Sequence, residues 1–316
     1  MSLLRCILPV VFLAVAVRAE AASFRVREAW SNYWGGTESV FHLESADRAA
    51  IRWRLSIGGQ TLLQGASRVA ADGMHEVAIA WPPVKPGVVL EARLDFSRAD
   101  EGVTRTVYLF NDEPFAGRRE WLADLRMVLY DPPGTTADLF DAAEFPYTRI
   151  SNLAALEGHD GVILIGEGVV LEEEPGLADS VWKAAARGAR VLCLAPASGV
   201  FALPGPRDAE LPQPRCLAFR GSEAITALDK RLDAYAWPPD GVLASRHFTL
   251  ASDRQRVVAE VTGPETGWPW IEASYSGGGR VVWCAFDLVR CWTSGPTPRE
   301  LFDRLLTSLT NNKKEH

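Results

Sequence analysis

The sequence predicts two domains: an antiparallel β-sandwich, then an α/β domain with a doubly wound parallel sheet. Apolar and polar residues alternate over residues 22–112, with turn residues between the segments and no helical pattern. From about residue 121 the pattern changes to short, continuous apolar runs separated by helical spacing, which is typical of buried parallel strands joined by helices. A chain of 316 residues also suits two cores better than one.

The first 21 residues have the pattern of a secretory signal peptide. Arg5 precedes an apolar run over 6–17, and Ala19-Glu20-Ala21 is a small-x-small cleavage site. The run is too short to cross a bilayer, and no later stretch reaches the roughly 20 apolar residues of a transmembrane helix. We expect cleavage near Ala21 and an exported protein, periplasmic or extracellular, with no membrane contact. An uncleaved amphipathic anchor is the alternative.

Composition narrows the range of partners and cofactors. The net charge is −7 and no basic run is present, so we expect no nucleic acid partner. Neither a CxxC motif nor a cysteine–histidine cluster suggests a metal, and we expect no cofactor. The even number of cysteines after the leader allows one disulfide, and buried free thiols are the alternative. These cysteines are Cys193, Cys216, Cys284 and Cys291.

The first domain, 22–112, contains four clear strand patterns. Strands of this length without helices between them predict an immunoglobulin-like sandwich. Glycine and proline turns separate the segments. The predicted strands are 51–57, 75–81, 88–96 and 104–110.

An aromatic segment near the start of this domain is a candidate binding surface. Its aromatic faces and flanking amide suit a sugar ring, so Trp30, Asn32, Tyr33 and Trp34 are candidate carbohydrate-contacting residues. The alternative is that these side chains fill the sandwich core or its interface with a neighbour.

A short polar connector, 113–120, separates the domains. Pro114 and Gly117 mark the boundary, and we expect Phe115 and Trp121 to pin the connector onto one domain. The connector lacks the Gly/Ser composition of a free coil, so the two domains should form one rigid unit.

The second domain, 121–312, is followed by a tail at 313–316. We expect Thr135 or Thr136 to cap the first of its helices, and Pro298 to lie in the first turn of the last. Strands are predicted over 125–130, 147–150, 162–165, 191–194, 217–219, 257–261, 271–274 and 280–286. Helices are predicted over 137–143, 177–185, 225–235 and 297–309.

Acidic residues follow several predicted strands of the α/β domain. Glu167 lies between Gly166 and Gly168, at the carboxyl end where open α/β sheets bind ligands. Asp131 and Asp287 also lie at predicted strand ends. Paired carboxylates suit glycoside hydrolysis, in which one is the acid and the other the nucleophile or base. The alternative is that these acids cap helices or bind turns.

The order DGVILIGEG, then a helix ending in RGARVLCLAP, resembles the class I glutamine amidotransferase-like fold, which is flavodoxin-like. Active members carry a Gly-x-Cys-x-Gly elbow. Laying VLCLAP on that elbow places Cys193 at the first glycine and Ala195 at the nucleophile, and no His-x-Glu pair follows Phe286. The resemblance therefore implies a pseudoenzyme without amidotransferase activity.

A second resemblance covers most of the chain after the leader. AWSNYWGG, NDEPFAGRREWL, LYDPPGTTADLF and YSGGGRVVWCAFDLV are similar to accessory modules of exported bacterial proteins related to family-2 glycoside hydrolases. In those proteins a sandwich and a degenerate amidotransferase-like domain lie beside a separate catalytic barrel.

Together these features predict a non-catalytic binding or assembly protein in carbohydrate or polysaccharide processing, with a carbohydrate or a glycoside hydrolase as its partner. One alternative is a glycoside hydrolase-type enzyme that uses the carboxylates around Glu167. Another is an oligomerisation module of a larger glycosidase complex.

Overall fold

The computed structural model describes residues 24–202, 213–243, 247–251, 256–260 and 269–311, with the backbone alone for 247–251 and 256–260. The predicted leader and the 313–316 tail lie outside the described residues, as does Val261 at the end of one predicted strand. Within the described part, no helix is long and apolar enough to cross a membrane.

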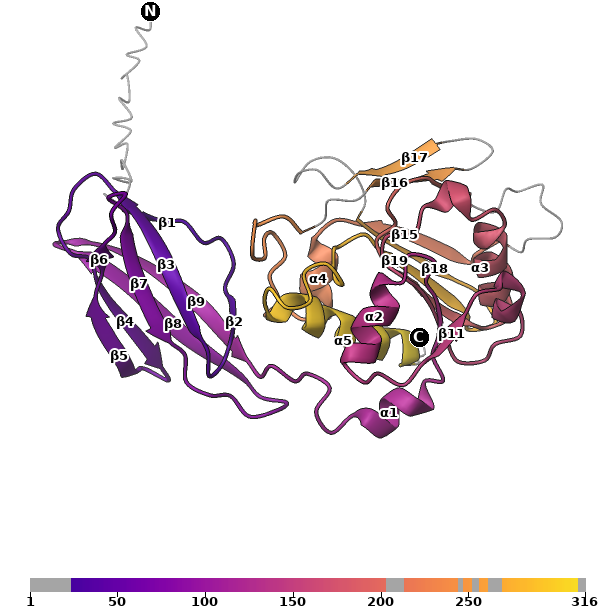
Figure 1. Cartoon of the computed structure of the whole chain (residues 1–316), viewed down its shortest axis with the longest axis horizontal. Coiled ribbons are helices and arrows are strands. Elements are labelled where there is room, and N and C mark those ends of the chain that lie inside the picture. The colour runs from indigo at the N-terminus through magenta and orange to yellow at the C-terminus, as the bar shows by residue number, and fades with distance from the viewer. Residues whose placement is uncertain (1–23, 203–212, 244–246, 252–255, 261–268, 312–316) are drawn as a thin grey trace, which may run out of the picture.

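Two facing β-sheets form the first part of the chain (Figure 1). Their orders are β1-β3-β7-β6 and β2-β9-β8-β4-β5, and all the pairs are antiparallel except β2 with β9. The strands are β1 (Phe24–Val26), β2 (Asn32–Trp34), β3 (Glu38–Ser45), β4 (Arg52–Ile57), β5 (Gln60–Ala66), β6 (Arg68–Val69), β7 (His75–Ala80), β8 (Val89–Arg98) and β9 (Glu101–Phe110).

Alternation places the apolar residues of both sheets in one shared core. Phe41 and Leu43 of β3 are fully buried against Leu94 and Phe96 of β8. The four predicted strands correspond to β4, β7, β8 and β9 and are confirmed. Their period of two is the reason that one face of each strand is buried.

A seven-stranded sheet, in the order β11-β10-β12-β13-β19-β18-β15, forms the centre of the second part. The five strands β11, β10, β12, β13 and β19 are parallel to one another, whereas β18 and β15 are antiparallel to their neighbours. The prediction of an all-parallel sheet was therefore wrong at this edge. The strands are β10 (Val128–Tyr130), β11 (Thr148–Ile150), β12 (Val162–Ile165), β13 (Arg190–Cys193), β15 (Cys216–Arg220), β18 (Trp270–Ser274) and β19 (Arg280–Cys284).

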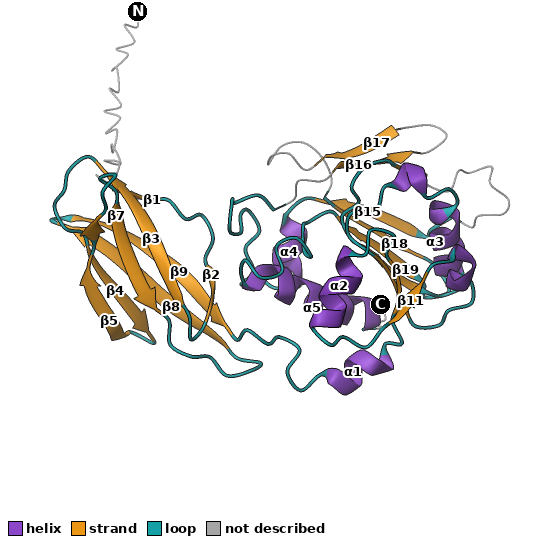
Figure 2. Ribbon diagram, in the orientation of Figure 1, coloured by secondary structure: helices purple, strands orange, loops and turns teal. Residues whose placement is uncertain are grey.

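Both faces of this sheet are covered (Figure 2). Val162 and Leu164 of β12 share a core with α5, while Ile163 and Ile165 face the other side and share a core with α3. Burial on both faces explains why β12 and β13 read as continuous apolar runs. The helices are α1 (Arg119–Asp124), α2 (Thr135–Ala142), α3 (Leu177–Ala186), α4 (Glu223–Leu228) and α5 (Pro296–Thr310), with 3-10 turns at Leu153–Leu156 and Leu171–Glu173.

Two helical predictions need correction. The helix predicted over 225–235 ends at Leu228, because the Asp229 side chain accepts hydrogen bonds from the backbone and guanidinium of Arg231 and so favours a turn. Neither Thr135 nor Thr136 caps α2, whose N-cap is the left-handed Gly134.

A separate three-stranded sheet was not predicted as such. It has the order β14-β16-β17, with β14 (Val200–Ala202), β16 (His247–Ala251) and β17 (Arg256–Glu260). The segment predicted over 257–261 falls in β17, and β14 pairs parallel with β16.

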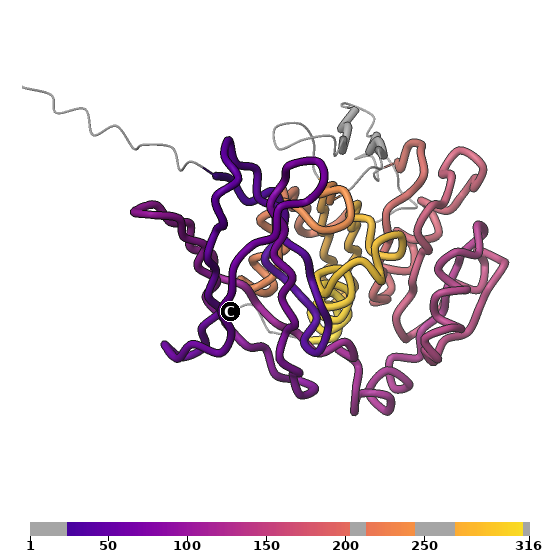
Figure 3. The backbone as a smooth tube through the Cα atoms, turned by 60° about the vertical axis from the view of Figure 1, so that its left-hand side comes forward, coloured from indigo at the N-terminus to yellow at the C-terminus, as the bar shows by residue number. Residues whose placement is uncertain are grey.

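The two parts of the chain contact each other directly, and β2 lies beside α5 (Figures 1 and 3). Asp233 accepts hydrogen bonds from the backbone N–H and hydroxyl of Ser31, both at 2.8 Å, and from the Asn32 N–H at 3.2 Å. The Asn32 amide donates to the Arg231 carbonyl at 2.8 Å. Phe110, the last residue of β9, belongs to the same apolar core as α5.

Candidate functional site

The three acids predicted at strand ends are all buried. Asp131 follows β10 and Glu167 follows β12, and these two strands are neighbours in the sheet. Asp287 lies just beyond β19. Their exposed fractions are 2%, 3% and 0%. Each carboxylate is therefore shielded from bulk solvent, and hydrogen bonds from the protein hold it in place.

Both the side chain and the backbone of Glu167 form hydrogen bonds. Its carboxylate accepts hydrogen bonds from the backbone N–H groups of Val289, at 2.8 Å, and Arg290, at 3.0 Å. Its own N–H donates to the Thr136 hydroxyl at 2.8 Å. The side chain thus ties the end of β12 to the turn after β19.

Asp131 binds the first turn of α2. Its Oδ2 accepts a hydrogen bond from the Ala137 N–H at 2.8 Å, a role usually played by an N-cap side chain. Burial raises the pKa of this carboxyl, and hydrogen bonds from backbone N–H groups at the start of α2 partly oppose that rise. Gly166 lies so close to the same carboxyl that a Cβ at this position would collide with it.

Asp287 belongs to the turn that Glu167 holds. Its Oδ2 accepts a hydrogen bond from Arg290 Nε at 2.9 Å. The sheet therefore brings Asp131, Glu167 and Asp287 to one edge, as the sequence implied, and each accepts a hydrogen bond from a backbone amide or a guanidinium. Chemically, this arrangement fixes the loops at the carboxyl edge of the sheet.

Ala195, which the sequence resemblance places at the nucleophile position of an elbow, is fully buried. The Ala195 carbonyl accepts a hydrogen bond from the N–H of Gly168 at 2.7 Å, and Gly168 has a φ of +87°, which favours glycine. Cys193 is buried in β13, and burial raises the pKa of its thiol. A raised pKa leaves little thiolate at neutral pH, so Cys193 is a poor nucleophile.

The predicted sugar-stacking surface is wrong for Tyr33 and Asn32, which are buried. Tyr33 packs in the sandwich core against Trp81, with ring centroids 4.9 Å apart, and Asn32 lies in the domain interface. Trp34 is half-buried and packs under the Arg299 guanidinium, 5.0 Å from its ring centroid. Trp30 is half-buried and packs against the same sandwich core. These residues fill the core and the interface, the alternative that the sequence left open.

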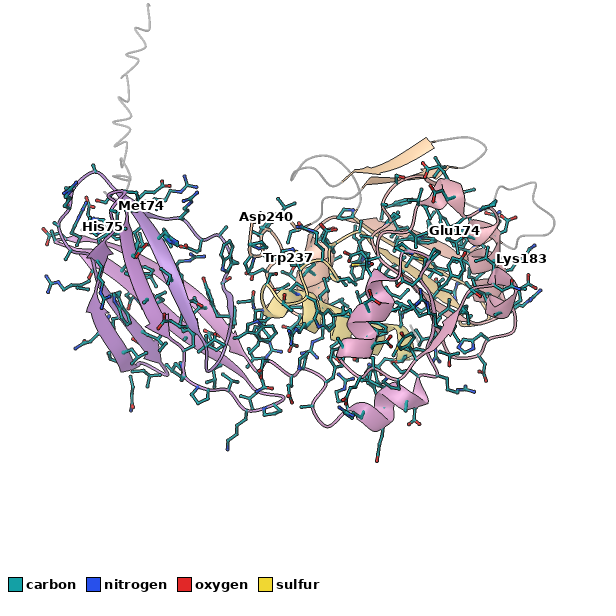
Figure 4. All side chains as sticks on the ribbon, in the orientation of Figure 1. Met74, His75, Glu174, Lys183, Trp237 and Asp240 are labelled. Carbon is teal, nitrogen blue, oxygen red and sulfur yellow. The ribbon has the colours of Figure 1, made fainter. Side chains whose placement is uncertain are left out.

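The histidines and cysteines form no site in the described residues. His75, labelled in Figure 4 on the sandwich, is buried between the Ser67 hydroxyl and the Asp47 carbonyl, both at 2.9 Å. No group of three metal-binding side chains occurs within the described ranges. The four described cysteines are free: Cys193, Cys284 and Cys291 are buried thiols, the alternative to a disulfide, whereas Cys216 is exposed.

A cavity of about 220 Å³ lies where the connector meets the second domain. Its walls combine connector residues with the end of α2 and the residues just before and within α5. No sequence motif marked this site, because Phe115 and Trp292 are far apart in the chain and meet only in the fold. The nearest sequence signal was the aromatic residue within a polar connector.

No protein-family model matches the chain, and neither does any curated protein. Several solved structures are similar to parts of it, among them the following three. The titin M3 domain covers 29% of this chain and 98% of its own length, at 10% identity and a TM-score of 0.21. The match to the PKD domain of human SorCS2 covers 35% of this chain and 94% of that domain, at 10% identity and a TM-score of 0.19. The match to a candidate alpha-galactosidase from Bacteroides fragilis covers 55% of this chain but only 37% of the galactosidase chain, at 11% identity and a TM-score of 0.18. Scores this low carry no argument about function, and the sheets above rest on their own strand pairing.

Proposed function

We propose that this chain is a non-catalytic binding or assembly protein in carbohydrate processing, built from an immunoglobulin-like sandwich and a degenerate, flavodoxin-like α/β domain of the amidotransferase type. The bonding of Glu167 is the observation that supports it most directly. A catalytic carboxylate pair has to reach the substrate, whereas Glu167 is buried and accepts two backbone hydrogen bonds.

The test compares binding with turnover in the same preparation. Affinity electrophoresis in gels containing different polysaccharides measures binding, and aryl glycosides and glutamine measure hydrolysis. We expect retardation by at least one polysaccharide and no turnover of either substrate class. Glycoside hydrolysis that disappears in a folded Glu167→Gln variant would instead establish the hydrolase alternative.

Export is part of this proposal. The leader pattern over residues 1–21 supports it. Expression of the full chain in a bacterial host, followed by N-terminal sequencing of the periplasmic and secreted fractions, should give a mature chain that starts near Ala22. A chain that stays in the cytoplasm and still begins at Met1 contradicts export.

A further inference from the structure

The cavity beside the connector has an aromatic floor. The rings of Phe115 and Trp292 are nearly parallel, at 8°, with centroids 6.4 Å apart, and Phe145 meets Phe115 edge-on at 4.8 Å. Phe145 and Trp292 are buried, and Phe115 is half-buried. The two buried rings therefore support Phe115, which is the ring of the three with accessible apolar C–H and π surface for a ligand.

Polar groups of both signs surround this floor. The exposed pair Arg119 and Glu144, 2.7 Å apart, lines the cavity together with the exposed Asp112 and Glu113. Because carboxylates only accept and guanidinium groups only donate hydrogen bonds, this rim can satisfy groups that do both. Hydroxyl groups do both, so a neutral ligand that carries several hydroxyls suits this rim.

One side of the cavity is rigidly held. Arg299 donates from Nη1 to the Asp112 carbonyl and from Nε to the Trp292 carbonyl, both at 2.8 Å. Its guanidinium also lies over Trp34 of the sandwich and over Trp292, at 5.0 and 5.8 Å from the ring centroids. Arg299 thus fixes the sandwich, up to the residue before the connector, and the turn before α5 beside the cavity. A cavity that is already ordered costs a ligand less entropy on binding.

We infer that this cavity binds a single neutral pyranose ring, its face on the aromatic floor and its hydroxyls on the mixed rim. The volume of about 220 Å³ lies below the roughly 300–1,000 Å³ of pockets that hold drug-sized ligands, so it suits a single sugar ring better than an oligosaccharide. This site rests on the proposed function, since it gives the carbohydrate partner a location and a class.

Calorimetric titration of the mature protein tests the site. The probes are the neutral methyl α-glucoside, α-galactoside and α-mannoside, with glucuronate and glucosamine as the charged arms. We expect at least one neutral glycoside to bind and to bind more tightly than either charged sugar. Tighter binding of glucuronate or glucosamine than of every neutral glycoside overturns the assignment to a neutral ring.

Two rim variants and two matched controls locate the binding. Arg119→Ala and Glu113→Gln should each weaken binding roughly tenfold or more, as loss of a hydrogen bond to a charged group does. Arg126→Ala removes a similar exposed ion pair, to Asp160 at 2.8 Å, away from the cavity, and Glu120→Gln neutralises a neighbouring exposed acid. Both controls should bind like the wild type.

The two failures are distinguishable. If the wild type binds a polysaccharide or a glycoside and the rim variants bind equally well, the cavity is the wrong site and the proposed function stands. If the wild type binds no glycoside and no polysaccharide, the carbohydrate function and this site both fail.

Discussion

Asp233 is the buried acid that joins the two parts of the chain. It is 8% exposed, and burial raises its pKa from 3.8 to about 6, although Ser31 and Asn32 donate hydrogen bonds to it. Because the folded pKa is raised, the stabilisation from the protonated acid is fully present below about pH 4 and is lost as pH rises through about 6.

Asp233→Asn removes this pH dependence while keeping a carbonyl acceptor. Between pH 4 and pH 8 we expect the wild type to lose about 3 kcal/mol of unfolding free energy relative to the variant. This value is the rise in pKa from 3.8 to about 6, converted to free energy. Urea unfolding of both proteins across this range measures the difference. A difference that does not change with pH would show that Asp233 titrates normally.

Gly166 makes a second prediction at the scale of one residue. A Cβ here would collide with the Asp131 carboxyl, which is itself held by α2. We expect Gly166→Ala to destabilise the protein by about 1–3 kcal/mol, the usual cost of overpacking. Gly277→Ala is the control, because its Cβ meets its nearest neighbour at 3.8 Å and its φ is not left-handed. Equal stability of the two variants in thermal denaturation would contradict the packing around Asp131.

Single residues show where prediction from sequence stopped. The strand pattern correctly placed Glu167 and Asp131 at one edge of a sheet, because strand direction alone determines that edge. The hydrogen-bond partners of Glu167 lie in the turn at Val289 and Arg290, and no local spacing links them to it. The cavity was missed for the same reason.

At the scale of elements, the turn after β19 depends on one side chain. Glu167→Gln replaces one of its two carboxylate acceptors by an amide donor, which leaves a backbone N–H of Val289 or Arg290 without its acceptor. We expect a cost of about 1–3 kcal/mol and faster amide hydrogen exchange in this turn. Glu173→Gln, at an exposed position, is the control and should change neither quantity. Unchanged exchange at Val289 and Arg290 would argue against the hydrogen bonds.

Burial explains why some strands were predicted and why β5 was not. Strands β12, β13 and β19 are continuous apolar runs with almost no exposed surface, and the sequence predicted each of them. Every residue of β5 is exposed, and it is held by backbone pairing to β4 at the edge of its sheet. Hydrophobic periodicity reports burial, so such a strand gives little signal.

For the whole molecule, the short connector correctly suggested contact between the domains but not its location. Trp121 packs against the apolar core around α5, which also contains Phe110 of β9, and the Arg118 guanidinium lies 3.8 Å from its ring centroid. The contact between the domains is made instead by Asn32 and Trp34 of β2 with the Arg231–Asp233 segment and α5. A segment predicted to bind sugar is therefore the one that joins the domains.

This interface should make the two domains unfold together. Asn32 is buried, and its amide donates to the Arg231 carbonyl at 2.8 Å, so Asn32→Ala leaves that carbonyl without this donor and opens a gap between the domains. We expect one calorimetric transition for the wild type. For Asn32→Ala we expect either a free energy of unfolding lower by about 1–3 kcal/mol, seen as a lower transition temperature, or two separate transitions. Thr37→Ala is the control, since its exposed hydroxyl bonds only locally, to the Trp34 carbonyl at 2.9 Å, and its loss should leave one transition. Two separate transitions in the unmutated protein would mean that β2 and α5 touch without coupling the domains, and then the Arg299 contacts to Trp34 would not hold the cavity rigid.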